Sequence, residues 1–386
     1  MERNAGTIRR RGVADPGRQI LKVHQIEMLR DALNAILNQS DLEVLRTMAS
    51  AIRDEISGWP GNSVPVTSIE RKVSIGVVIG ELNQIISSAS PERALYYAKR
   101  LQRSLETTKT NKVNDLDLSR WKEYDEVITD SLWIEEKRDR SGEHSGWYWG
   151  NFIPQIPKQM MLRYTKRGDW VLDPFLGSGT TLIECRGMGR NGIGLELSAK
   201  ILEKSSEAIE RERNPFNART RTYLGDALTA DYERIREENG IREFQLAILH
   251  PPYQDIIRFS DSPDDLSTIK DTGEFVHKIG ELASRLHTHI QDGRMLVLVI
   301  GDKYENGLHI PLGFYSMNEI MSRGYALKTM VVKNFDSTRG KRSSEQLWRY
   351  RALAGGFYIF KHEYIFVFRK IKASSLEIAG RRSRDI

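Results

Sequence analysis

The segment that most constrains this chain is a glycine-containing loop between a short apolar run and a helix. Residues 170–172 have the length and composition of a buried strand, and Asp-Pro-Phe-Leu-Gly-Ser-Gly-Thr-Thr follows over residues 173–181. Glycine adopts positive φ without steric cost, so Gly177 and Gly179 allow a tight turn and a close approach of the backbone to a ligand. A helix that begins near Thr180 presents unpaired backbone N–H groups in its first turn. The segment therefore predicts a strand, a ligand-binding turn and a helix, with a ligand-free turn as the alternative.

Further apolar runs of strand length follow this loop. They cover residues 192–195, 245–249, 295–300, 326–333 and 363–370, and helical patterns separate most of them. This alternation predicts a doubly wound, mostly parallel α/β sheet of the Rossmann-like type, in which ligands bind beyond the carboxyl ends of the strands. No helix is predicted between the last two runs, so we expect them to form an antiparallel hairpin at one edge of the sheet.

The first part of the chain has a different pattern. Apolar residues recur at helical spacing from Gln19 to Trp59, and two more helical blocks follow at residues 68–87 and 90–105. Residues 135–144 are polar and charged, as in a linker. We therefore expect a disordered basic N-terminus over residues 1–16, an all-helical domain over 17–140, an α/β domain over 147–370 and a basic tail over 371–386.

The glycine loop has no third glycine, so it is not a dinucleotide-binding GxGxxG loop. It also lacks the lysine of a Walker phosphate loop. It resembles motif I of the DNA amino-methyltransferases, the family that modifies N6 of adenine or N4 of cytosine. In that family the loop wraps the methionine moiety of S-adenosylmethionine. The resemblance therefore predicts this cofactor and a methyltransferase domain over residues 147–370. It assigns to the cofactor the loop residues Asp173, Pro174, Phe175, Gly177, Ser178, Gly179, Thr180 and Thr181.

Three residues outside the loop extend the resemblance. Glu196 directly follows the apolar run 192–195, where a carboxylate can accept hydrogen bonds from both ribose hydroxyls of the cofactor. Asp226, in Gly-Asp-Ala, resembles the acid that accepts the adenine amino group of the cofactor, with a surface turn as the alternative. Phe152, in Asn-Phe-Ile-Pro, resembles the motif X phenylalanine that covers the cofactor, with simple core packing as the alternative.

His250-Pro251-Pro252-Tyr253 follows the apolar run 245–249. It is similar to motif IV of the amino-methyltransferases, in which Asp, Asn or Ser precedes Pro-Pro and an aromatic residue. An exocyclic base amine is a poor nucleophile, so two acceptors must hold its hydrogens and keep its nitrogen in line with the methyl group. The resemblance gives these roles to His250 and the Pro251 carbonyl. Pro252 would help to stiffen the loop, and Tyr253 would stack on a base flipped out of the duplex.

The histidine at position 250 departs from the usual motif. A neutral imidazole offers one acceptor nitrogen and a protonated one offers none, so His250 can accept only in its neutral form. Because enzymes with an acidic first residue are mostly adenine-directed, we favour N4 of cytosine over N6 of adenine as the target. The order of motifs X, I and IV leaves no room for a recognition domain between motifs I and IV. Target recognition is therefore expected after motif IV or in the N-terminal helices.

Basic residues concentrate near the C-terminus. Residues 333–386 contain thirteen Lys or Arg and five Asp or Glu, a difference of +8, whereas the whole chain carries +6. A cationic segment with interleaved aromatic residues favours contact with DNA, with a solvated basic loop as the alternative. The candidate DNA-contacting residues are Arg339, Lys341, Arg342, Arg349 and Arg351.

Two further features of the sequence bear on the cellular location of the protein. No apolar run reaches transmembrane length, and Cys185 is the single cysteine, which excludes an intramolecular disulfide. We therefore expect a cytoplasmic site-specific DNA methyltransferase without a metal, with double-stranded DNA as its partner and a cognate restriction or defence system as a further candidate partner. An RNA base amino-methyltransferase and a catalytically degenerate nucleic-acid-binding relative are the alternatives.

Overall fold

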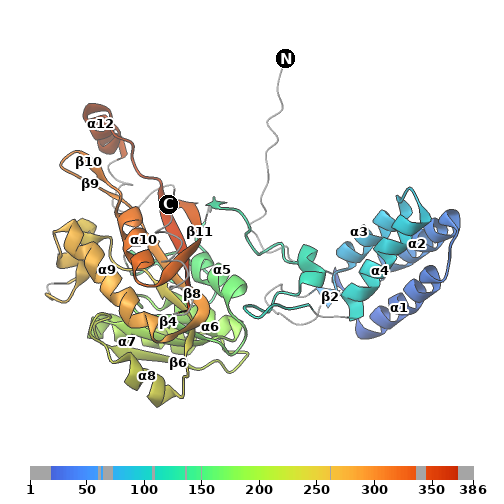
Figure 1. Ribbon diagram of the computed structural model, residues 1–386, viewed down its shortest axis with the longest axis horizontal. Helices are drawn as coiled ribbons and strands as arrows, with labels where there is room; N and C mark the ends of the chain where they lie inside the picture. Colours follow the sequence, from blue (N-terminus) through green and yellow to red (C-terminus); the bar gives the residue numbers. More distant parts are fainter. Residues whose placement is uncertain are drawn as a thin grey trace, which may run out of the picture. The chain divides into compact units, whose positions relative to one another are not determined.

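The computed structural model describes residues 19–59, 62–63, 73–106, 109–134, 137–148, 150–260, 262–335 and 345–372 (Figure 1). The chain forms two compact units, residues 1–127 and residues 128–386. The predicted disordered N-terminus over residues 1–16 lies outside the described residues, as does the predicted tail from residue 373 onward. In the part of the chain that the structure describes, no helix is long and apolar enough to cross a bilayer.

The first unit is helical and has its own core. Its elements are β1 (Gln19–Ile20), α1 (Val23–Leu37), α2 (Leu42–Ser57), β2 (Asn62–Ser63), α3 (Ile75–Ile86), α4 (Pro91–Glu106) and the 3-10 helix η1 (Leu118–Glu123). Asp41 starts α2, since its carboxylate accepts the Val44 N–H at 3.0 Å as an N-cap. Apolar residues at helical spacing meet in the centre of this unit, among them Leu29, Leu33, Ile36, Leu45, Leu82, Ile85 and Leu101.

An eight-stranded sheet organises the second unit. The strands lie in the order β3 (Leu132–Trp133), β11 (Tyr325–Asn334), β12 (His362–Lys370), β8 (Ile290–Ile300), β7 (Phe244–Leu249), β4 (Trp170–Asp173), β5 (Asn191–Glu196) and β6 (Thr220–Leu224). Strand β12 is antiparallel to both of its neighbours, and the other neighbouring pairs are parallel. A small hairpin, β9 (Lys303–Glu305) with β10 (Leu308–Ile310), follows β8. The predicted doubly wound, mostly parallel fold is confirmed.

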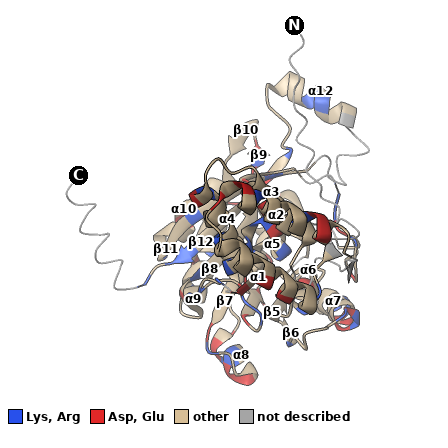
Figure 2. Ribbon diagram, turned by 90° about the vertical axis from the view of Figure 1, so that its right-hand side faces the viewer, with Lys and Arg blue, Asp and Glu red and all other residues tan. Residues whose placement is uncertain are grey.

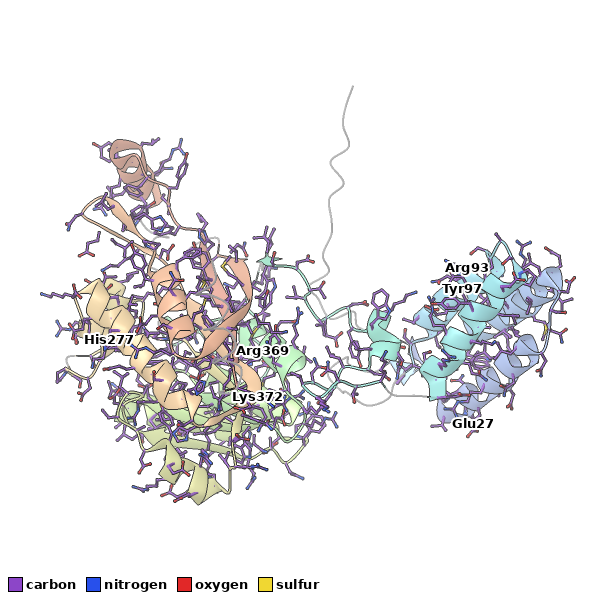
Figure 3. The ribbon with its side chains drawn as sticks, in the orientation of Figure 1. Glu27, Arg93, Tyr97, His277, Arg369 and Lys372 are labelled. Carbon is purple, nitrogen blue, oxygen red and sulfur yellow. The ribbon has the colours of Figure 1, made fainter. Side chains whose placement is uncertain are left out.

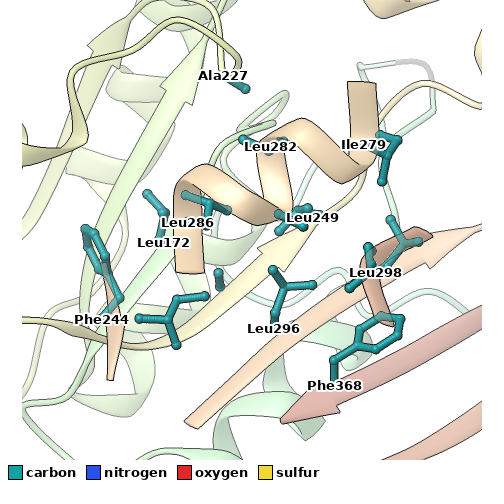
Figure 4. Close-up of a cluster of buried hydrophobic side chains, with 14 of the residues drawn as sticks. Leu172, Ala227, Phe244, Leu249, Ile279, Leu282, Leu286, Leu296, Leu298 and Phe368 are labelled. Atoms are coloured by element: carbon teal, nitrogen blue, oxygen red, sulfur yellow. The ribbon is translucent and has the colours of Figure 1, made fainter. Parts of the chain in front are cut away.

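Helices cover both faces of this sheet. One face packs against α8 (Tyr232–Asn239), α9 (Thr272–His287) and α10 (Leu312–Ser322) in the main apolar core. In Figure 4, Ile279, Leu282 and Leu286 of α9 lie over apolar side chains of the central strands. The helices α5 (Gln155–Tyr164), α6 (Thr180–Met188) and α7 (Ala199–Arg211) form a second layer, in which α6 and α7 share a separate apolar cluster.

The strand order places a topological switch point between β4 and β7. After β4 the chain adds β5 and β6 on one side, and it then returns to add β7 and β8 on the other side. Strands β4 and β7 are paired in parallel through Val171 with Leu246 and Leu172 with Ala247. In doubly wound sheets, ligands bind beyond the carboxyl ends of the strands at such a point. The glycine loop follows β4, and His250 follows β7, so both segments leave the sheet there.

The structure differs from the sequence-based expectation at the last two strands. They pair antiparallel as expected, through a register that includes Val331 with Ile365. However, β12 is inserted between β8 and β11, and the short strand β3 forms the outer edge beyond β11. A helix that was not expected, α12 (Glu345–Gly355), lies between the two strands. Its described residues are mostly exposed, and this explains why no apolar stripe reveals it in the sequence.

The division between the units also lies earlier in the chain than the expected linker at residues 135–144. The second unit begins at Ile128, whose N–H donates to Gln159 Oε1 at 2.9 Å and whose carbonyl accepts from Arg163 Nη1 at 2.7 Å. A few residues later, β3 pairs with β11. The segment that precedes α5 is therefore fastened to the sheet and its helices.

Candidate functional site

The glycine loop is held in shape by a buried carboxylate at the end of β4. Asp173 is 1% exposed and accepts the Thr181 hydroxyl at 2.5 Å and the Phe175 N–H at 3.0 Å. Burial raises the pKa of Asp173 to about 6, although these hydrogen bonds act to lower it. Gly177 and Gly179 adopt φ values of 51° and 83°, which other residues rarely adopt. The loop thus has the tight turn that its glycines predicted.

Glu196 at the end of β5 lies next to this loop. One carboxylate oxygen accepts the Gly177 N–H and the other accepts the Ser198 N–H, both at 3.0 Å. Burial raises the pKa of Glu196 above its ordinary value. Each carboxylate oxygen has two acceptor positions, so a second donor can bind to each. The structure therefore brings together the glycine loop and the acid that the sequence predicted for a ribose.

The segment before α5 contacts the same loop. Asn151 donates from its amide to the Ser178 hydroxyl at 2.7 Å, and Arg138 donates from Nη1 to Asn151 Oδ1 and to the Phe152 carbonyl, both at 2.8 Å. The Nε and Nη2 atoms of Arg138 are buried, and neither has a hydrogen-bond partner among the residues that the structure describes. Burial lowers the pKa of this guanidinium below its ordinary value. Arg138 was not predicted, because nothing in its local sequence indicates that it contacts residues next to the loop.

An aromatic pair lies over the loop. Tyr148 packs so closely on Gly177 that a side chain at this position would approach the tyrosine ring to 2.9 Å. Phe259 stacks on Tyr148, with the ring centroids 5.8 Å apart. Phe259 belongs to the segment between Tyr253 and α9, which includes the 3-10 helices η2 (Gln254–Ile256) and η3 (Leu266–Thr268). The chain on the carboxyl side of the His-Pro-Pro-Tyr sequence thus reaches back to the glycine loop.

His250 stands at the end of β7 between two aromatic residues. Its ring is partly buried and lies 4.7 Å from the Phe152 ring between centroids. On its other side, His250 Nε2 is 3.2 Å from the Tyr253 hydroxyl. Burial lowers the pKa of His250 to about 4, with a further lowering by Lys333 and an opposing effect of Glu363. The imidazole is therefore neutral at pH 7, which is the form that can accept a hydrogen bond.

Tyr253 connects this histidine to a buried ion pair. Its hydroxyl donates to Glu363 Oε2 at 2.8 Å, and Lys333 Nζ is 2.9 Å from Glu363 Oε1. Lys333 on β11 and Glu363 on β12 are opposite each other in the strand register, and both are buried. Burial acts to raise the pKa of Glu363, but Lys333, His250 and Tyr253 together hold this pKa below its ordinary value. The Glu363 carboxylate is therefore ionised at neutral pH.

Sequence reasoning missed both members of this pair. The available signal was a charged residue next to an apolar run in each of the two strands, Lys333 after Met-Val-Val and Glu363 before Tyr-Ile-Phe. Such residues are almost never fully buried unless they are paired. Their partners are far away in sequence, so the pairing could be recognised only once the strand order was known.

The remaining predicted cofactor residue, Asp226, follows β6. Its carboxylate accepts the Leu228 N–H and the Thr229 hydroxyl, both at 3.0 Å. These bonds shape the turn between β6 and α8, which fits the alternative of a turn residue. A contact of Asp226 with the adenine of a cofactor stays a prediction.

The predicted DNA-contacting residues fall into two groups. Arg339, Lys341 and Arg342 lie outside the described residues. Arg349 and Arg351 are exposed on α12, where Figure 2 marks basic positions, and the Arg351 guanidinium lies 5.2 Å from the Trp348 ring. Tyr350 is also exposed, at 69%. Beyond α12, Phe357 and Phe360 pack against Tyr304 of β9, with centroids 4.8 and 4.7 Å apart. This helix and its flank therefore combine exposed cations with aromatic rings.

Comparison with known families supports the resemblance found in the sequence. Residues 83–207 match the sequence model of the DNA methylase family N6_N4_Mtase. The matched segment contains the glycine loop and Glu196, and it ends before His250. The similarity to the DNA amino-methyltransferases is therefore confirmed for about a third of the chain, residues 83–207, while the individual site residues stay predictions.

Curated relatives match over short segments. Type II methyltransferase M.MjaII of Methanocaldococcus jannaschii is 49% identical over 51 residues, which cover 13% of this chain and 10% of the relative. M.HpaI of Haemophilus parainfluenzae is 38% identical over 61 residues, 16% of this chain and 19% of the relative. M.MthZI of Methanothermobacter thermautotrophicus is 36% identical over 86 residues, which cover 22% of this chain and 23% of the relative. The matches thus span less than a quarter of each of these relatives.

Solved structures have lower sequence identity to this chain than these relatives. TrmN from Thermus thermophilus matches with a TM-score of 0.36 and 15% identity, over 57% of this chain and 49% of TrmN. The [4+2]-cyclase SpnF matches with a TM-score of 0.39 and 16% identity, over 58% of this chain and 86% of SpnF. Scores this low do not establish a shared fold, which follows here from the strand order itself.

Proposed function

We propose that this chain is an S-adenosylmethionine-dependent DNA methyltransferase that acts on an exocyclic amino group of a base. One observation carries the proposal: the glycine loop after β4 and the His-Pro-Pro-Tyr sequence after β7 both leave the doubly wound sheet at its switch point. Phe152, from the segment before α5, packs on His250 and joins the third predicted motif to the other two. The similarity to DNA methylases and to Type II methyltransferases supports this function.

The residues around the glycine loop fit the chemistry of the cofactor. S-adenosylmethionine supplies a methyl group on a positively charged sulfur, together with a ribose, an adenine and a carboxylate. Glu196 has acceptor positions left for the two ribose hydroxyls. The orphaned N–H groups of Arg138 suit a carboxylate, which guanidinium groups bind through charge-assisted hydrogen bonds. In this proposal Phe152 covers the cofactor and Asp226 accepts from its adenine amino group.

The His-Pro-Pro-Tyr loop would prepare the amine of the target base. His250 and the Pro251 carbonyl each accept one N–H, which directs the nitrogen lone pair toward the methyl group. Transfer would break the bond between the methyl group and the sulfur, whose electron pair would stay on the sulfur, and the new N–CH₃ bond would leave the nitrogen with one proton too many. That proton passes to the bare nitrogen of His250, and the electron pair of the broken N–H bond stays on the amine. The target base must leave the duplex to reach this loop, and Tyr253 is proposed to stack on it.

We favour N4 of cytosine over N6 of adenine as the methylated position. The first residue of motif IV is a neutral histidine here, whereas an acidic residue is typical of adenine-directed members. The burial that lowers the pKa of His250 keeps the ring neutral and supports its use as an acceptor.

The proposed setting is a site-specific modification enzyme in the cytoplasm, paired with a cognate restriction or defence system, as the Type II names of the relatives suggest. DNA is proposed to contact the basic segment that contains Arg339, Lys341 and Arg342 together with α12. Arg349 and Arg351 would bind phosphates, and such contacts position the duplex without reading its sequence.

The direct test is transfer of a labelled methyl group from S-adenosylmethionine to purified nucleic acids. We expect incorporation into duplex DNA, none into tRNA, and loss of most of the rate in a His250→Ala variant. Methylation-sensitive sequencing of DNA from expressing cells then identifies the base and the recognition site. Labelling of tRNA alone would replace the DNA proposal with an RNA one. No labelling of either substrate would indicate a degenerate relative.

A further inference from the structure

Four side chains of the second unit form a hydrogen-bonded series. His250 and Tyr253 belong to the His-Pro-Pro-Tyr loop, Glu363 lies on β12 and Lys333 lies on β11. From the interior outward, Lys333 Nζ is 2.9 Å from Glu363, the Tyr253 hydroxyl is 2.8 Å from Glu363, and His250 Nε2 is 3.2 Å from the Tyr253 hydroxyl. The Tyr253 ring rests on Gly301, just after β8, where a side chain would approach it to 3.0 Å. The series is therefore fixed by strands β8, β11 and β12 beneath the loop.

The number of hydrogens in this series determines its direction. An ionised carboxylate only accepts, and a tyrosine hydroxyl has a single hydrogen to donate. Because this hydrogen goes to Glu363, the hydroxyl can only accept from His250. The hydrogen of the neutral imidazole must then be on Nε2. His250 Nδ1 is left as the bare nitrogen, and it makes no hydrogen bond to a described residue.

We infer that Glu363, held in place by Lys333, is a positioning residue that acts through Tyr253 to fix His250 with its hydrogen on Nε2 and to present Nδ1 as the acceptor. The use of Nδ1 for the base amine rests on the proposed function, whereas the position of the ring hydrogen does not. Neither Glu363 nor Lys333 needs to contact the base. Their effect is on the direction in which the Tyr253 hydroxyl donates.

The placement of the charges supports a positioning role over simple packing. A buried ion pair is weak evidence for stability, because apolar residues of similar size are often equally stabilising. This pair is next to the hydroxyl that contacts His250, and the charges that affect the His250 ring come from Glu363 on β12 and Lys333 on β11. Phe152 covers the ring from the side of α5 with an apolar surface. Glu363 is thus the acceptor that determines which way the Tyr253 hydrogen points.

The decisive measurement is the position of the ring hydrogen of His250, by ¹⁵N–¹H NMR of histidine-labelled protein at pH 7. The signals are assigned by their loss in a His250→Asn variant. We expect the hydrogen on Nε2 in the unmodified protein. The double variant Lys333→Met/Glu363→Met removes both charges, so no uncompensated charge is buried. Tyr253 then has no carboxylate to donate to, its hydrogen turns to His250 Nε2, and the ring hydrogen moves to Nδ1.

A single hydrogen-bond variant and a matched control complete the design. Tyr253→Phe removes the hydroxyl that connects Glu363 to His250 and keeps the ion pair. We expect a mixture of imidazole rings with the hydrogen on Nε2 and rings with the hydrogen on Nδ1. Tyr364→Phe, on the next residue of β12, removes a hydroxyl that donates to Asp302 at 3.2 Å and should leave the His250 signals unchanged. Hydrogen on Nδ1 in the unmodified protein, or an unchanged ring form in the double variant, would overturn the inference.

Single-turnover methyl transfer tests whether the ring form matters for the reaction. With Nδ1 blocked by its hydrogen, we expect the double variant to be slower by at least about tenfold, at unchanged affinity for S-adenosylmethionine, since proton transfer by a positioned group typically contributes 10²–10⁴-fold. An equal rate in both proteins would overturn the role of Nδ1. If no variant methylates any nucleic acid, the proposed function fails, while the spectra still decide where the hydrogen is.

Discussion

At the scale of single residues, the carboxylates of Asp173 and Glu196 lie at the ends of neighbouring strands but have different roles. Asp173 is almost fully buried, and both of its oxygens bind donors within its own loop. Glu196 also binds two backbone N–H groups, but it lies at the next strand end and is less buried. Asp173 therefore shapes the loop, while Glu196 has the acceptor positions that a ligand with two hydroxyls requires.

This difference leads to a prediction for cofactor binding. Replacing Glu196 with Ala should weaken S-adenosylmethionine binding by roughly 1.5–3 kcal/mol, the range for hydrogen bonds to a charged group. Calorimetric titration measures the change. Glu207→Ala removes an exposed carboxylate from α7 and serves as the matched control, with no expected effect. Unchanged affinity in a folded Glu196→Ala protein would remove this residue from the cofactor site.

The pKa of His250 leads to a second prediction. A ring with its ordinary pKa would become charged near pH 6.5, but burial lowers the pKa of His250 to about 4. The rate of single-turnover methyl transfer should therefore be flat from pH 8 to about pH 5 and fall as the pH drops through about 4, where the acceptor is lost. His250→Ala should lose most of the rate and keep the cofactor, whereas His250→Asn and His250→Asp keep an acceptor and some activity.

The same shift has a consequence for stability, which must be monitored in this experiment. Between pH 6.5 and about 4 the unfolded chain binds a proton at His250 that the folded chain does not bind, so this residue lowers stability as the pH falls. Circular dichroism at each pH separates loss of fold from loss of rate. A fall in rate near pH 6.5 in a folded protein, or a wild-type rate in His250→Ala, would contradict the acceptor role.

At the scale of elements, the sequence predicted the features that contiguous residues form. It missed the features that depend on contacts between distant parts of the chain. The strand β4, the glycine loop and α6 are contiguous, so motif and fold could be recognised together. The insertion of β12 between β8 and β11 depends on contacts between residues far apart in the chain. Helix α12 was missed because it lacks a buried face. Arg138 was missed because nothing in its local sequence indicates its contacts, and Glu363 was missed because Tyr253 is distant from it in sequence.

Helix α12 carries the prediction for DNA binding. Replacing Arg349 and Arg351 with Ala should reduce the slope of log affinity against log salt concentration by about 0.9 for each lost phosphate contact, up to roughly 1.8. Fluorescence anisotropy with a labelled duplex at several salt concentrations measures the slope. The double variant Lys200→Ala/Arg221→Ala removes two exposed cations from α7 and β6 and should leave the slope unchanged. If α12 is only a solvated helix, the two double variants will give the same slope as the unmodified protein.

At the scale of the whole molecule, the chain has two separate cores. The core of the first unit contains residues between Leu21 and Leu105, and the main core of the second contains residues between Trp170 and Phe368, with no shared member. The first unit has polar clusters of its own, such as Glu81 with Arg100 and Lys122, and the Arg93 guanidinium 5.2 Å from the Tyr97 ring on α4 (Figure 3). Each unit thus has the apolar interior and polar contacts of an independent folding unit.

Two cores predict two unfolding transitions in the full chain. Leu82 and Leu298 are each 0% exposed, one in each core, so Leu82→Ala and Leu298→Ala should each destabilise their own unit by roughly 2–5 kcal/mol. Calorimetry of the full-length protein should show that each variant shifts a different transition. A ligand stabilises the folded unit that binds it, so S-adenosylmethionine should raise the temperature of only the transition that Leu298→Ala lowers. Leu82→Ala should leave the affinity for the cofactor unchanged. A single transition that both variants lower and the cofactor raises would mean that the two units unfold together.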